Sequence, residues 1–234
     1  MEKLLNTSIL KEKTMHAYSI DKKIRNTVSI VLFVISYSLS MILQAKLSPQ
    51  LEAIYTQFTT WGLGDIVDFI KASGILPNVL EAAFIYLLIS YAFEHWIWKC
   101  PAIRWIHKIP NLNGHWKGNL NSSYSDDPIS MELEVCQTWS EISFKSKFPK
   151  SESYSNTAAI HIEHNRGVSI YFGFHNDSTE ISTGMQSYDG YNILTLQEKN
   201  TITARYFNNR PNLKKNSKGI KGGNMGTFTL TREE

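Results

Sequence analysis

The chain has 234 residues and a formal net charge of +3, with 24 Lys and Arg against 21 Asp and Glu. This near balance does not favour a DNA or RNA polymer as partner, because the phosphates of nucleic acids select strongly basic surfaces. The two cysteines, Cys100 and Cys136, form neither a disulfide framework nor a zinc pattern and fit a reducing compartment. Cys100 follows an apolar run and is either an inert thiol or a site of palmitoylation.

The first apolar run follows a basic leader. Residues 1–25 carry six Lys and Arg, and residues 26–45 then carry no charged side chain. A helix of this length rises about 30 Å, the thickness of the hydrocarbon core of a bilayer. A cleaved signal peptide is the alternative, but the leader is long and polar and no small-x-small site follows the run. The sequence therefore predicts a cytoplasmic leader and a first membrane span over about 26–45.

A second apolar run covers about residues 75–98 and ends in tryptophans of the kind found at headgroup depth. The connection over 48–74 has apolar residues at helical spacing and breaks at Gly62 and Gly64, which predicts an amphipathic segment at the membrane surface. Residues 99–110 form a juxtamembrane linker. Lys and Arg are concentrated in the leader and the linker, so the positive-inside rule predicts a two-span hairpin with both termini in the cytoplasm.

Two kinds of polar residue interrupt these spans. Ser36 and Ser40 form a small-xxx-small pair, which allows close helix packing in lipid, although serine hydroxyls also bond back to their own helix. Glu81 and Glu94 are costly in lipid, and they either reach an interface or serve assembly or a pore. The sequence leaves both alternatives open.

From residue 111 onward the apolar residues follow a period of two. In "ISMELEVC", Ile129, Met131, Leu133 and Val135 alternate with polar residues. Turn residues separate such runs, so most of them are joined as short hairpins. The predicted strands are 115–121, 129–136, 141–148, 158–163, 168–174, 188–197, 201–207 and 226–231.

Eight strands with one apolar face each predict an up-and-down barrel over residues 111–234. Gly114-x-Trp116 and the late Arg232 resemble the lipocalin closure, in which a tryptophan and an arginine pack at the closed end. Charged residues on the outer faces exclude a membrane barrel. The predicted fold class is membrane α plus all-β: an N-terminal two-helix transmembrane hairpin followed by a soluble eight-stranded up-and-down, lipocalin-like β-barrel.

The same period places polar and aromatic side chains inside the barrel. Gln137 and Trp139 continue the apolar face of their strand, and Tyr206 shares a face with Ile202. Such residues gathered at one mouth suit a ligand with flat rings and polar edges. The alternative is that Trp116 and Trp139 are core plugs.

A basic segment follows the seventh predicted strand. Residues 205–221 carry six Lys and Arg and no acid, and Gly222-Gly223 comes next. The segment either closes over an anionic ligand, rests on the anionic inner leaflet or forms a solvated loop.

No residue pattern indicates catalysis. His161, Glu163 and His164 are close in sequence, but on a strand His164 points away from the other two, which is poor geometry for a metal. No Walker loop, nucleophile elbow or paired-carboxylate signature occurs, so a hidden hydrolase has no residue support. The sequence predicts a binding protein that is not an enzyme and uses no metal or cofactor.

The order of two spans, a linker and a barrel resembles the CBASS anti-phage effectors called CD-NTase-associated protein 15. The local points of likeness are "GHWKG" at 114–118, "CQTW" at 136–139, "FPKSESYSNTA" at 148–158 and "YFNNR" at 206–210. The resemblance covers most of the chain. It implies that the barrel binds a cyclic dinucleotide made by an infection-activated CD-NTase. The spans then self-associate among the membrane lipids and disrupt the bacterial inner membrane, which causes abortive infection.

Six side chains are expected to bind this ligand. A cyclic dinucleotide has two bases and two phosphates, so it needs stacking platforms and cations. The candidates are Trp139, Tyr206 and Arg210 for these roles, and Gln137, Ser151 and Ser153 for polar edges. The alternative function is a membrane-tethered lipocalin-like binding protein for a small apolar ligand, which predicts an interior without polar clustering.

Overall fold

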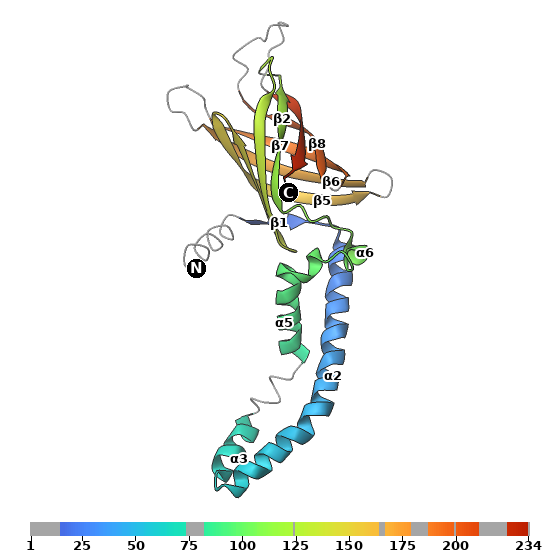
Figure 1. Ribbon diagram of the computed structural model, residues 1–234, viewed down its shortest axis with the longest axis vertical. Helices are drawn as coiled ribbons and strands as arrows, with labels where there is room; N and C mark the ends of the chain where they lie inside the picture. Colours follow the sequence, from blue (N-terminus) through green and yellow to red (C-terminus); the bar gives the residue numbers. More distant parts are fainter. Residues whose placement is uncertain are drawn as a thin grey trace. The chain divides into compact units, whose positions relative to one another are not determined.

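The computed structural model describes residues 15–73, 82–123, 125–163, 167–178, 187–198, 200–210 and 224–233. The chain divides into a helical unit over residues 22–106 and a β unit that combines residues 1–21 with 107–234. The N-terminal residues thus belong to the β unit, although the helical unit separates them from it in sequence (Figure 1).

The helical unit is built on one long helix. Its elements are α2 (Lys22–Thr60), α3 (Gly64–Ser73), α5 (Ala82–His95), the short η1 (Ile97–Lys99) and α6 (Arg104–His107), which runs into the β unit. The first part of α2, Lys22–Lys46, is 25 residues long and apolar enough to cross a membrane. Large apolar side chains on it are exposed, as for Ile30 at 63%.

α2 continues beyond the expected end of the first span. The helix contains Pro49, runs to Thr60 and is followed by a turn at Gly62, whose φ is +80°. Proline lacks an amide hydrogen, and α2 bends along its length (Figure 1). Much of the segment expected as a separate connection is therefore helix continuous with the first span, and α3 forms the remainder.

The second expected span, over about 75–98, does not form one helix of that length in the described part of the chain. α5 has 14 residues, which rise only about 21 Å. Residues 74–81, including Glu81, lie outside the described residues. α5 packs against α2, with the ring centroids of Phe33 and Tyr86 6.5 Å apart. One described helix thus qualifies as a span, and the two-span hairpin stays a prediction.

Two of the polar residues in the first span are shielded from solvent, whereas Ser29 and Ser38 are exposed. Ser36 and Ser40 are both buried. The hydroxyl of Ser36 donates a hydrogen bond to the carbonyl of Leu32 at 2.7 Å. The sequence left two alternatives for this pair, close packing of helices or a hydrogen bond of the hydroxyl to its own helix. For Ser36 the structure shows both burial and the hydrogen bond to its own helix.

The β unit contains nine strands. They are β1 (His16–Ser19), β2 (Gly114–Ser122), β3 (Ile129–Gln137), β4 (Glu141–Phe148), β5 (Ser151–Glu163), β6 (Gly167–Ser178), β7 (Tyr188–Glu198), β8 (Thr201–Asn208) and β9 (Met225–Arg232). Successive strands from β2 to β9 pair antiparallel, and β2 also pairs with β9, which closes a barrel. The prediction of an antiparallel β unit is confirmed, and the expected count of eight strands is corrected to nine. The additional strand, β1, comes from the segment expected to be a cytoplasmic leader.

Two strands are longer than the sequence predicted. β5 begins at Ser151 instead of residue 158, and β6 continues to Ser178 instead of ending at 174. Both extensions carry polar residues on the inner as well as the outer face, so the apolar alternation that marks a strand is missing there.

Apolar side chains fill most of the interior. Large ones with at most 2% of their surface exposed include Trp116, Leu133, Ile142, Phe144, Ile170, Phe172 and Leu194. The rings of Phe144 and Phe172 stack with centroids 4.2 Å apart. Antiparallel pairing gives the barrel two ends. We name the end at Gly114 the closed end and the end at Ser122 the mouth.

Candidate functional site

The closed end is plugged by the segment that precedes β2. Ile109 and Leu112 are fully buried. The indole N–H of Trp116 donates to the carbonyl of Leu112 at 3.0 Å, and the Arg232 guanidinium carbon lies 4.4 Å from the Trp116 ring centroid. Nη2 of Arg232 also donates to the carbonyl of Asn111 at 2.6 Å. The expected packing of a tryptophan on a late arginine is confirmed, and Trp116 is a core plug.

Gln137 and Trp139 belong to this closed end. Gln137 is 2% exposed, and its Oε1 accepts a hydrogen bond from the amide of Leu112 at 2.9 Å. Trp139 packs on His107 with ring centroids 5.2 Å apart. The expectation that both residues share a mouth with Tyr206 is wrong, because β3 ends at the closed end while Tyr206 pairs near the start of β9, at the mouth. Their contacts make both of them parts of the closure.

The barrel interior becomes polar at the mouth. The buried polar side chains there are Ser146, Ser151, Ser153, Asn176 and Asn192. Of the expected ligand-binding residues, the structure brings Ser151, Ser153 and Tyr206 together at this end. Asn176 and Asn192 were missed. Continuing the period of two past Phe174 would have placed Asn176 on the inner face of β6.

Asn176 is the centre of this polar cluster. It is 1% exposed, and its Nδ2 donates to Oγ of Ser153 at 2.7 Å and to Oγ of Ser151 at 3.3 Å. Its Oδ1 is buried and accepts no hydrogen bond from the residues that the structure describes. An unmatched buried acceptor costs about 1–3 kcal/mol. A ligand that brings an N–H donor to this oxygen would recover that free energy.

Aromatic rings and a cation border the polar cluster. The hydroxyl of Tyr206 donates to Oγ of Ser122 at 2.7 Å. The guanidinium carbon of Arg210 lies 5.7 Å from the ring centroid of Tyr188. Burial raises the pKa of both tyrosines, so their phenols stay neutral and can donate hydrogen bonds. Tyr206 and Arg210 were expected at the site, whereas Tyr188 was not.

The cavity at the mouth is small. It measures about 40 Å³ and lies between side chains of eight strands, β2 to β9, among them Ser153, Tyr188, Asn192 and Tyr206. One water occupies about 30 Å³ in the liquid. The described cavity therefore admits an edge of a base, whereas the rest of a dinucleotide would lie across the mouth.

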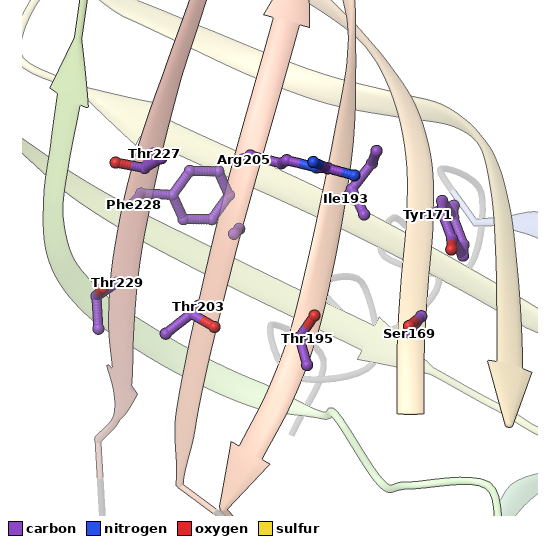
Figure 2. A pocket seen from close by; sticks show the side chains of 10 residues that line it. Ser169, Tyr171, Ile193, Thr195, Thr203, Arg205, Thr227, Phe228 and Thr229 are labelled. Carbon is purple, nitrogen blue, oxygen red and sulfur yellow. The ribbon is translucent and has the colours of Figure 1, made fainter. Parts of the chain in front are cut away.

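A larger hollow lies on the outer face of β6–β9. It measures about 560 Å³, and Figure 2 shows the side chains that line it. Four hydroxyl residues face one another across the strands: Ser169, Thr195, Thr203 and Thr229. Arg205 is the one charged residue among those lining this groove, all of which are described. The mouth also has one described cation, Arg210, but it adds the unmatched buried oxygen of Asn176, and no residue lining the groove has a buried side-chain N or O atom without a partner.

An exposed ionic cluster lies on the rim of the mouth. Nδ1 of His175 is 2.7 Å from Oδ1 of Asp189, and Nε2 is 3.2 Å from Oδ1 of Asp177. The hydrogen bond with Asp189 raises the pKa of His175 above its usual 6.5, and Asp177 adds a smaller effect. The stabilising contribution of this cluster is complete below about pH 6.5 and is lost as the pH rises through the higher folded-state pKa.

The Asp189→Asn variant is expected to lower the pKa of His175 toward 6.5. The side chain of His175 is 46% exposed, so solvent screens the pair and the accompanying change in stability should be small. Titration of the His175 ring protons by NMR measures the pKa directly. The matched variant Asp177→Asn should lower it less, and a larger effect of Asp177→Asn would contradict this assignment.

Other residues singled out in the sequence do not enlarge the site. The basic segment beyond Arg210 lies outside the described residues, as does His164. His161 packs against Tyr171, with ring centroids 5.5 Å apart. Across the described part of the chain, no three His, Cys, Asp or Glu side chains are grouped so that they could hold a metal ion.

These features define a class of protein. A closed barrel with a filled core and one polar mouth is typical of a binding protein for a small polar ligand, and the apolar helix of membrane length is a candidate anchor. The family model for the Cap15 cyclic dinucleotide receptor domain matches residues 107–232. The chain belongs to this family of CBASS effectors. A comparison with curated proteins found no match.

Proposed function

We propose that this protein is a non-enzymatic membrane effector that binds a cyclic dinucleotide at the mouth of its barrel and then assembles in the bacterial inner membrane. The observation that carries the proposal is the mouth of a receptor-family barrel, where the unmatched Oδ1 of Asn176 lies in a cluster bordered by two tyrosines and an arginine. The alternative of an apolar-ligand carrier predicts no such polar cluster.

Each part of the ligand has a matching group at the mouth. Tyr188 and Tyr206 offer rings on which bases can stack, each worth about 1–3 kcal/mol. Arg210 offers a cation for a phosphate. Asn176 and the two serines bonded to it offer hydrogen-bonding groups for the edge of an inserted base. The size of the cavity implies that the phosphates stay at the rim, beside Arg210.

The path of the chain supports two membrane spans. The β unit includes residues 1–21, so the chain leaves this unit into α2 at Lys22 and returns to it at residue 107. Both ends of the helical unit therefore lie on the side of the membrane where the barrel is. The helices then cross an even number of times, with the second crossing through α5 and the residues before it. The Lys and Arg residues of the leader favour the cytoplasm for that side.

Ligand binding has to favour the assembled form to act as a switch. A ligand that binds both forms equally shifts nothing. Moving an equilibrium from 1:99 to 99:1 takes a preference of about 5.5 kcal/mol. In the proposed sequence of events, a CD-NTase supplies the cyclic dinucleotide during infection. Self-association of the helical units then disrupts the membrane and causes abortive infection.

The full-length protein in detergent is expected to bind one member of a panel of cyclic dinucleotides and to convert from small to large species. Suitable probes are cyclic di-AMP, cyclic di-GMP, cyclic di-UMP and the mixed AMP–GMP and AMP–UMP rings. The full chain is needed because β1 belongs to the β unit. Calorimetry measures the affinity, and sedimentation velocity measures the size.

Linear dinucleotides of the same bases serve as the control and should neither bind tightly nor change the sedimentation. Binding of none of the cyclic probes would refute the receptor function, and tight binding without a change in sedimentation would refute the assembly step.

A further inference from the structure

β1 occupies a gap in the barrel wall. β4 and β5 pair directly only near the mouth, from Lys145 with Tyr154 to Phe148 with Ser151. Farther from the mouth they separate, and β1 fills the space between them (Figure 1). We name this space the seam. The direct pairs keep the mouth side of the barrel closed without β1, whereas the seam itself needs a strand to satisfy its backbone groups.

Four register pairs hold β1 in the seam. The pairs are His16 with Ile142 and Ala17 with Glu141 on β4, and Tyr18 with Ala158 and Ser19 with Ala159 on β5. Inside the wall, Tyr18 is 3% exposed and Ile20 is 9% exposed. This strand of four residues is held by the buried Tyr18, by the adjoining Ile20 and by the contact of His16 with Ser155, and it makes a specific contact that is short enough to open and re-form.

The seam is connected to the proposed ligand site through β5. Oγ of Ser155 accepts the amide of Phe144 at 2.9 Å and lies 2.8 Å from Nε2 of His16. Two residues earlier, Ser153 accepts the hydrogen bond from Asn176. A register shift in β5 between Ser155 and Thr157 marks the place where the strand leaves β4 and meets β1. A ligand that changes the hydrogen bonds of Ser153 therefore acts on β5, the strand that pairs with β1.

We propose that the seam is an interface between copies of this chain, and that on activation it accepts β1 from a second copy in place of its own. The inference rests on the proposed function, because it supplies the contact by which ligand-bound copies assemble. An exchanged strand makes the same hydrogen bonds and buries the same side chains in the partner as in its own barrel, so the exchange changes the connectivity at little cost in contacts.

The position of β1 in the chain favours this exchange. Only Ile20 and Asp21 separate it from α2, and short hinge segments of this kind favour exchange between copies. Copies held in one membrane also meet at a high effective concentration. When each copy gives its strand to one neighbour and receives a strand from another, the contact is head-to-tail and extends to a ring or a filament. Every added copy brings another α2 next to the previous one.

Two single-cysteine populations test the exchange. Ala17 and Glu141 are register partners on antiparallel strands, a spacing that a disulfide can bridge. One full-length population carries Ala17→Cys and the other Glu141→Cys, both with Cys100→Ser and Cys136→Ser. They are mixed in detergent, incubated with the cyclic dinucleotide from the panel that drives sedimentation, and oxidised. Neither single-cysteine protein can form this disulfide within one chain.

The mixed disulfide dimer is expected to increase by about tenfold or more when the ligand is present, because the ligand shifts the population toward the exchanged state. The control mixes Asn119→Cys with Thr229→Cys, register partners in the β2–β9 pair, which should yield no mixed dimer. Assembly by sedimentation without the Ala17–Glu141 disulfide would overturn the exchange and leave the proposed function intact. A lack of assembly would overturn the proposed function, and the exchange with it.

Discussion

In the Arg210→Ala variant of the full chain, the affinity for the cyclic dinucleotide is expected to fall by about 10- to 150-fold. A hydrogen bond to a charged group contributes about 1.5–3 kcal/mol, and 1.4 kcal/mol is a factor of ten in affinity. The guanidinium of Arg210 lies over Tyr188 at the rim, where a phosphate of a ligand with one inserted base would lie. Calorimetry with the full-length protein measures the loss.

The matched control for this variant is Arg205→Ala. Arg205 carries the same charge on the same hairpin, but its side chain lines the groove on the outer face (Figure 2). Its removal should change the affinity little. A larger loss for Arg205→Ala than for Arg210→Ala would place the ligand in the outer groove. If Arg210→Ala and Tyr206→Ala both left the affinity unchanged, the assignment of the mouth would be wrong.

The Trp116→Ala variant is expected to lower the free energy of unfolding of the barrel by about 3–5 kcal/mol, the usual cost of truncating a large buried aromatic side chain. Trp116 has no exposed surface, donates a hydrogen bond to Leu112 and lies under the guanidinium of Arg232. Its loss leaves a cavity and also removes the contacts with Leu112 and Arg232 that hold the closed end together. Urea unfolding of the protein, followed by circular dichroism of the β unit, measures the change.

Phe207→Ala is the matched control for this second prediction. Phe207 is also an aromatic strand residue of the barrel, but it is 53% exposed, and its ring centroid lies 5.8 Å from that of Tyr191. Its removal should cost no more than about 1.5 kcal/mol. Equal destabilisation by the two variants would show that the closed end contributes little to the stability of the barrel.

The apolar pattern predicted the bounds of the strands best where the inner face of the barrel is apolar. In β3 apolar and polar residues alternate from Ile129 to Cys136, and in β4 only Ser146 interrupts the apolar inner face, so the predicted bounds lie within a residue of the observed ones. The first half of β5 and the last residues of β6 were missed because Ser151, Ser153 and Asn176 replace the apolar residues of the inner face. The polar groups that form the candidate site therefore also hid the strands that carry it.

Other differences have separate physical causes. A period of two gives the face of a side chain but not the end of the strand at which it lies, so Gln137 was placed inside the barrel but at the wrong end. Following the strand directions through β4 would have separated Gln137 from Ser151. β1 was missed because four residues are too short for an alternation to be distinctive, and because its partners are more than 100 residues away in sequence.

Among the described residues, the stacked pair Phe144–Phe172 helps to fill the barrel interior below the mouth, so that the barrel resembles a cup. Below this pair the described interior side chains have almost no exposed surface, so a filled core separates the mouth from the closed end in this part of the chain. A ligand at the mouth must leave by the route along which it arrived. Whatever covers that opening, whether a neighbouring copy or another part of the chain, would slow release without adding any contact inside the cup. The residence time of the bound ligand would then depend on the contacts at the rim of the mouth.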